Sequence, residues 1–140
     1  MRKLIFLSLL LGAIYLVAGC GLRQLQADEK VSKDEEYTGE HFDIINLAKG
    51  FIEQLSNGEY KEAVERLDDS MIDKLNSEEL EEIWLGLEEE FGDYIQQEFH
   101  SAEKIDRYYL VFITGSFKDA DLTFRLTIDM DNQITDLRIR

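Results

Sequence analysis

The sequence predicts an α+β fold in which three N-terminal helices pack on a curved four-stranded antiparallel sheet. Apolar residues recur every three or four positions between about residues 41 and 91, which is the period of an amphipathic helix. From about residue 94 to residue 140 they recur at every second position, which is the period of a strand. Helices followed by strands are typical of α+β folds, and residues 41–140 are therefore expected to form a single domain.

The first two helices are expected before residue 76. Apolar residues on one face of the first helix are Phe42, Ile45, Ala48, Ile52 and Leu55. Gly58 follows this helix and stops it, because glycine readily takes the left-handed conformation found at helix ends. A second, shorter helix is expected over residues 60–67, and residues 71–75 add another turn or two.

The third helix is the clearest element of the sequence. Asn76 and Glu79 have the spacing of a capping box, which predicts the start of a helix, and Gly92 predicts its end. Its apolar face consists of Leu80, Ile83, Trp84, Leu87 and Phe91. The acidic residues between them are expected to form a solvated outer face rather than a cation site.

Four strands are expected, over residues 94–104, 107–114, 122–130 and 134–140. Residues 107–114 are apolar on both faces, so this strand is expected to be central or to line a cavity. Gly115 and residues 118–121 are expected to form a turn, and Asp131-Asn132 a tight hairpin turn rather than part of a calcium loop. The alternation slips between Ile134 and Leu137, which predicts a bulge.

The N-terminus has the layout of a secretory signal peptide, predicted over residues 1–19. Arg2 and Lys3 precede the apolar run 4–17, which is short for a membrane span, since a span needs roughly 20 residues. The run ends in Val17-Ala18-Gly19-Cys20, which resembles the lipobox of bacterial lipoproteins. The resemblance implies that a diacylglyceryl group alkylates Cys20, that cleavage falls between Gly19 and Cys20, and that the two acyl chains anchor the protein to the outer leaflet of the bacterial cell membrane.

Two other interpretations of the N-terminus stay open: an uncleaved signal anchor, and a cleaved signal with an incidental cysteine. Residues 20–40 are expected to be the lipidated cysteine and a flexible, charge-rich tether, with a short helix through Leu22, Leu25 and Lys30 as the alternative.

Composition excludes several functional classes. The chain has 30 acidic and 15 basic residues and a formal net charge of −15, so it is repelled by nucleic-acid backbones, and nucleic-acid binding is excluded. A single cysteine excludes a disulfide framework and a cysteine-based zinc site. The lack of proline and the use of Lys, Glu, Ile and Asn suggest a low-GC Gram-positive source.

No catalytic motif, metal site or cofactor site is predicted. His41 and His100 lack neighbours at metal-ligand spacing, although His100 remains a candidate general acid or base. Candidate pocket residues are Tyr60, Trp84, Tyr94, Tyr108, Tyr109 and Arg125. Trp84 is expected to be a core anchor or a ligand-stacking residue, and Arg125 to be solvent-exposed or to bind an acidic ligand.

The pattern resembles the family of domains of unknown function numbered 3887. The residues that carry the resemblance are Phe51, Gly58-Glu59-Tyr60, Ala63-Val64, Leu67-Asp68, Met71, Leu75, Leu80, Trp84, Leu87, Gly92-Asp93-Tyr94, Leu126-Thr127-Ile128-Asp129 and Ile134. The resemblance covers nearly all of residues 42–139 and implies a cystatin/NTF2-like superfold, a cone of helices wrapped by a bent antiparallel sheet. Such domains occur in bacterial exported proteins and lipoproteins, and they offer no catalytic residues to transfer.

Three functional hypotheses follow. The favoured one is an extracytoplasmic lipoprotein whose domain is a non-catalytic module that binds a protein, a peptide or a small apolar ligand. The second is a small enzyme of the isomerase or dehydratase type that uses a buried carboxylate or His100 inside the cone. The third is an accessory or inhibitory domain for a membrane-bound enzyme. A cone filled by apolar side chains would favour the first hypothesis, and an open polar pocket would favour the second.

Overall fold

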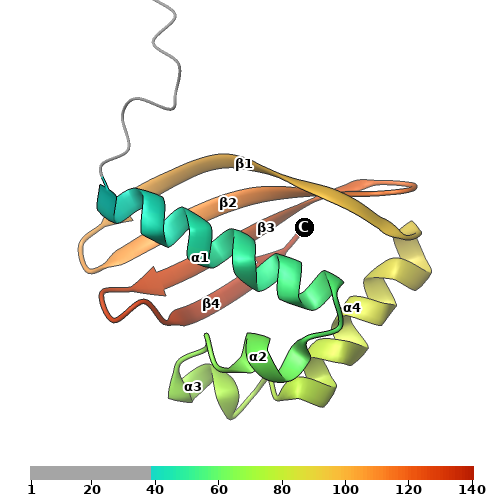
Figure 1. The fold of residues 1–140 in the computed structure, drawn as a ribbon, viewed down its shortest axis with the longest axis horizontal. Coiled ribbons are helices and arrows are strands. Elements are labelled where there is room, and N and C mark those ends of the chain that lie inside the picture. The colour runs from blue at the N-terminus through green and yellow to red at the C-terminus, as the bar shows by residue number, and fades with distance from the viewer. Residues whose placement is uncertain (1–38) are drawn as a thin grey trace, which may run out of the picture. The chain divides into compact units, whose positions relative to one another are not determined.

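Four helices and a four-stranded antiparallel sheet make up residues 39–140, which are the residues that the computed structural model describes (Figure 1). The predictions for the signal peptide, Cys20 and most of the tether lie outside these residues. The chain order is helices first and strands second, which confirms the α+β prediction. Within residues 39–140, no helix is long and apolar enough to cross a membrane.

The helices begin and end close to the predicted residues. Helix α1 spans Gly39–Ser56, so it already includes the last two residues of the predicted tether. Helix α2 spans Tyr60–Val64, α3 spans Asp69–Ile72 and α4 spans Ser77–Phe91. Both halves of the expected capping box at the start of α4 are present, because Asn76 accepts from the backbone of Glu79 and Glu79 accepts from the backbone of Asn76.

The described residues contain four helices where the sequence predicts three. The extra turns expected after Leu67 form the separate helix α3, because the Asp68 side chain caps a new helix by accepting from the Met71 backbone N–H. Leu67 itself forms an isolated parallel bridge with Ile134, which interrupts the helical path between α2 and α3.

The strands follow one another across the sheet in the order β1-β2-β3-β4. Their bounds are Tyr94–Ile105, Tyr108–Phe117, Asp121–Asp129 and Ile134–Ile139. Strand β2 is central, as one of the two predicted alternatives requires. The hairpin turn at Asp131-Asn132 is confirmed, and the Asp129 side chain closes it by accepting from the N–H groups of Asp131 and Gln133.

The predicted bulge is confirmed at Thr135. Thr127 pairs with Asp136 and Ile128 pairs with Ile134, so Thr135 is an extra residue on β4. Gly115 differs from its predicted place in a turn, since it lies inside β2. A Cβ atom at this position would lie 2.6 Å from Cε2 of Phe124, so only glycine lets that aromatic ring pack against the strand.

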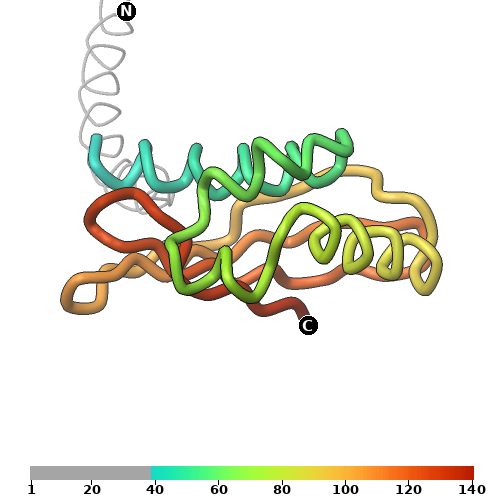
Figure 2. Tube along the Cα trace, turned by 90° about the horizontal axis from the view of Figure 1, so that it is seen from below, coloured from blue at the N-terminus to red at the C-terminus, as the bar shows by residue number. Residues whose placement is uncertain are grey.

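The hydrophobic core lies between the helices and one face of the sheet. Helix α1 crosses this face, and no helix in residues 39–140 covers the opposite face (Figure 2). The largest buried side chains on the core side include Phe51 from α1, Trp84 from α4 and Phe124 from β3. The helices thus leave one side of the sheet open, and residues on that side are available for binding.

Candidate functional site

The open face of the sheet carries a hollow lined mainly by arginines. We call it the arginine hollow; its residues are Phe112, Thr123, Arg125, Arg138 and Arg140, and its volume is about 260 Å³. The antiparallel register brings these residues together, because Phe112 pairs with Arg125 and Arg125 pairs with Arg138. In the next row, Thr123 and Arg140 exchange two backbone hydrogen bonds. The hollow is therefore built on strands, which hold its side chains in fixed rows.

An acidic side chain at the hollow organises two of its arginines. Nη2 of Arg125 and Nε of Arg138 each donate to the same carboxylate oxygen, Oδ2 of Asp136, at 3.1 Å. The side chain of Arg125 is 28% exposed and that of Arg138 is 55% exposed. Charge-assisted bonds of this kind hold a guanidinium group in a defined orientation.

Arg125 has hydrogen-bonding capacity that the described residues leave unused. Its Nε atom is buried and has no hydrogen-bond partner. A buried N–H without a partner carries a desolvation cost of about 1–3 kcal/mol. The three arginines gathered on one face are the feature that most clearly marks the hollow as a binding site.

An apolar strip adjoins the arginine hollow along β2. Leu110 and Phe112 are half-buried and Tyr108 is 45% exposed, and all three project from the open face because their neighbours on β2 point into the core. Tyr108 also borders a smaller hollow at the Arg107 turn. The open face therefore offers apolar contact and positive charge side by side.

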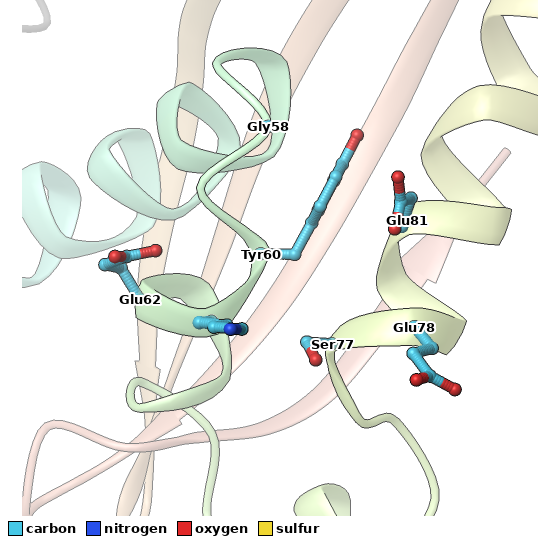
Figure 3. A pocket seen from close by; sticks show the side chains of 7 residues that line it. Gly58, Tyr60, Glu62, Ser77, Glu78 and Glu81 are labelled. Carbon is cyan, nitrogen blue, oxygen red and sulfur yellow. The ribbon is translucent and has the colours of Figure 1, made fainter.

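A second hollow lies between α2 and α4 (Figure 3). Its volume is about 340 Å³, and the Tyr60 side chain extends across it toward Glu81 on α4, whereas Glu62 points away. Burial, together with the negative charges of Glu81 and Glu88, raises the pKa of the Tyr60 hydroxyl. Three of its seven lining residues are glutamates and the hollow is open to solvent, so it has the character of a solvated surface.

The structure does not gather the six predicted pocket residues into one site. Trp84 and Tyr109 are 2% and 1% exposed and belong to the core. Tyr94 packs edge-on against Trp84, with ring centroids 5.3 Å apart. Burial raises the pKa of the Tyr94 hydroxyl to about 12, with a smaller contribution from the charge of Glu53. Trp84 thus takes the core-anchor place that was one of its two predicted alternatives.

Only two of the predicted pocket residues, Tyr108 and Arg125, share the open face of the sheet. Tyr60 lines the separate hollow between α2 and α4. His100 is an exposed extra residue at a bulge on the outer strand β1, away from the core.

A polar cluster fastens the start of α1 to the sheet. The Tyr109 hydroxyl donates to Oε1 of Glu40, and Nζ of Lys104 lies 3.4 Å from the same oxygen and 5.0 Å from the centre of the Tyr109 ring. The hydrogen bond from Tyr109 is the main cause that lowers the pKa of the Glu40 carboxyl. The ring of His41 packs edge-on against Tyr109. This cluster holds the start of the helix against the sheet.

Sequence reasoning missed four of the five residues of the arginine hollow. Phe112, Thr123, Arg138 and Arg140 are not predicted together with Arg125, because adjacency across strands depends on register, and the bulge at Thr135 sets the register between β3 and β4. Among residues 39–140, no group of three or more His, Cys, Asp or Glu side chains is arranged to bind a metal ion.

Comparison with protein families identifies the chain at the level of the whole domain. The family described as Protein of unknown function (DUF3887) matches residues 48–137, which is more than half of the chain. The chain belongs to the DUF3887 family. The match begins within α1 and ends within β4, so the DUF3887 region includes most of the helical layer and the whole of β1 to β3. Comparison with curated proteins and with solved structures gives no match.

Proposed function

We propose that this DUF3887 protein is an extracytoplasmic lipoprotein, anchored through Cys20 to the outer leaflet of a bacterial cell membrane, whose domain is a non-catalytic binding module. Its partner, a protein, a peptide or a small apolar ligand, lies on the open face of the sheet. Anchoring rests on the sequence alone, because the one cysteine of the chain stands directly after Val17-Ala18-Gly19 at the end of an apolar run.

The filled interior is the observation that carries the binding role. Side chains that an NTF2-like enzyme would arrange around a pocket are packed against one another here: Trp84 contacts the rings of Phe117 and Phe124 at centroid distances of 5.7 and 6.2 Å. Every buried residue of the described core is hydrophobic. We assign the ligand to the open face, because it combines the apolar strip with the arginine hollow.

The NTF2/cystatin-like superfold is part of the same proposal. It is supported by a long helix that lies across an antiparallel sheet formed by consecutive strands (Figure 1). The alternative of a small isomerase or dehydratase requires a titratable group with a shifted pKa in an apolar pocket. His100 lies exposed on the outer strand, which disfavours that role for it. The third hypothesis, an accessory domain for a membrane enzyme, is one form of the binding role.

The anchor is tested by replacing the lipidated residue. Cys20→Ser removes the only thiol of the chain, so the variant should take up no labelled fatty acid and should keep its signal peptide. Electrophoretic mobility and metabolic labelling of the membrane fraction measure both effects. Equal labelling of the variant and the wild type would overturn the anchoring proposal.

The binding surface is tested by site-specific photo-cross-linking in intact cells. A photoreactive residue in place of Leu110, on the open face, should give a discrete adduct. The matched control is the same residue in place of Leu85, which is 52% exposed on α4. No adduct at position 110, or the same adducts from both positions, would contradict the assignment of the open face.

A further inference from the structure

The arginine hollow has a local charge opposite to that of the chain. Arg125, Arg138 and Arg140 supply three guanidinium groups, and Asp136 supplies one carboxylate to two of them. The side chains that form the hollow therefore have a net positive charge in a chain whose net charge is −15. Arginine forks bind oxyanions through pairs of N–H groups, and they do so in carboxylate and phosphate sites alike.

We propose that the arginine hollow binds a single phosphate monoester whose organic part is apolar and lies on Phe112. This assignment rests on the proposed binding function of the open face and names the chemistry that it recognises. A phosphate monoester carries close to two negative charges at neutral pH and presents three acceptor oxygens, which suits a cluster of three guanidinium groups. A carboxylate presents only two acceptor oxygens and therefore satisfies fewer guanidinium N–H groups.

The donors of the hollow fit several oxygens. Thr123 and Arg140 line the hollow together with Arg125 and Arg138, so a hydroxyl and three guanidinium groups are available as donors. Asp136 already shows that an oxygen within reach of both Arg125 and Arg138 is held at 3.1 Å by each. The phosphate oxygens therefore compete with a carboxylate oxygen that the chain itself provides.

Size and overall charge restrict the ligand further. The volume of about 260 Å³ accommodates one phosphate group and a small appendage. The net charge of −15 repels extended polyanions, so the ligand is a small molecule or one modified side chain rather than a nucleic acid or an anionic membrane surface. Phe112, half-buried beside the arginines, supplies an apolar floor for the organic part.

The test is isothermal titration calorimetry, in which phenyl phosphate is titrated into the full chain in mild detergent. Benzoate has a similar ring with one charge and should bind about tenfold more weakly, because it forms fewer charge-assisted hydrogen bonds. Arg138→Gln should weaken phenyl phosphate binding by about tenfold. Arg107→Gln removes the same charge at an exposed turn outside the hollow and should leave the affinity unchanged.

Replacement of Asp136 should change the affinity for phenyl phosphate in the opposite direction. Asp136→Asn removes the internal competitor and should tighten phenyl phosphate binding several-fold. A purely structural role of Asp136 predicts weaker binding instead. Thermal unfolding of each variant, followed by circular dichroism, identifies any loss of affinity that follows from unfolding. Arg140→Gln is a second variant of the hollow and should also weaken phenyl phosphate binding.

The outcomes separate this assignment from the proposed function. Absence of phenyl phosphate binding, equal binding of benzoate, or wild-type affinity in both folded arginine variants would overturn the phosphate assignment. If cross-linking at position 110 persists in those cases, the binding module stands with a different ligand. If cross-linking also fails, the proposed function falls with the assignment.

Discussion

Replacement of Trp84 tests whether the filled core supplies most of the stability of the domain. Trp84 is 2% exposed on α4 and packs against Tyr94, Phe117 and Phe124 from three different strands, at centroid distances of 5.3, 5.7 and 6.2 Å. Its side chain therefore joins the helical layer to the sheet. Trp84→Ala would remove the largest buried side chain of the core and leave a cavity among these rings.

The expected loss of unfolding free energy is about 3–5 kcal/mol, which is the usual cost of truncating a buried tryptophan. A domain of this size has a total stability of roughly 5–15 kcal/mol, so the variant should be marginal. With a urea dependence of about 1–2 kcal/mol per molar, the unfolding midpoint should fall by roughly 1.5–5 M. Trp84→Phe keeps part of the packing, so its unfolding midpoint should lie between those of the wild type and Trp84→Ala.

Urea unfolding is monitored by far-ultraviolet circular dichroism. Tryptophan fluorescence does not serve here, because the Trp84 variants lack the only tryptophan of the chain. Leu85→Ala is the matched control, because Leu85 is the next residue of the helix and is 52% exposed. It should change the unfolding free energy by less than about 0.5 kcal/mol. Equal midpoints for Trp84→Ala and Leu85→Ala would refute the description of Trp84 as a core anchor.

Three further predictions concern local packing and charge. Gly115→Ala should lower the unfolding free energy by about 1–3 kcal/mol in the same urea assay, because the new Cβ would lie 2.6 Å from the Phe124 ring. Gly86→Ala should raise it by up to about 1 kcal/mol, because Gly86 lies within α4 with open space around its Cβ position. The pKa of the Glu40 carboxyl is lowered from 4.5, chiefly by the hydrogen bond from Tyr109, so Glu40 should stabilise the fold above about pH 4.5 and lose this effect as the pH falls through its folded value. Tyr109→Phe should reduce that acid dependence of the melting temperature, and an unchanged pH profile would count against the hydrogen bond.

The strands and the third predicted helix follow from the sequence because their signals are local. The predicted strand 94–104 is observed as Tyr94–Ile105, and the alternation of residues 122–130 places Leu122, Phe124, Leu126 and Ile128 in the core. The capping box at Asn76 likewise involves residues only three positions apart. Local hydrogen bonds and side-chain periods do not depend on the rest of the chain, so they are readable from the sequence.

Other features depend on residues that are distant in the sequence. Gly115 has the residue type of a turn, but its glycine is required because the ring of Phe124 occupies the space where a Cβ atom would lie. The path between α2 and α3 changes direction because Leu67 bridges to Ile134 and the Asp68 N–H donates to the Ile134 carbonyl oxygen. Neither contact has a local signature, since both depend on where the final strand lies in the sheet.

The arginine hollow shows how a local signal can determine a distant arrangement. If residues 134–140 alternated strictly, Arg138 would lie on the same face as Ile134, which is buried in the core. The extra residue Thr135 shifts the alternation by one, so Asp136 pairs with Thr127 and Arg138 with Arg125 on the open face. Burying an unpaired guanidinium in an apolar core would be costly, whereas the bulge leaves these charged side chains at the surface. The slip in alternation that predicts a bulge therefore also determines that the arginines of the last two strands meet. Deletion of Thr135 should in consequence be tolerated in the urea assay, because Ile134 would still pair with Ile128 in the core and Arg138 with Arg125 on the open face, now in an unbroken ladder.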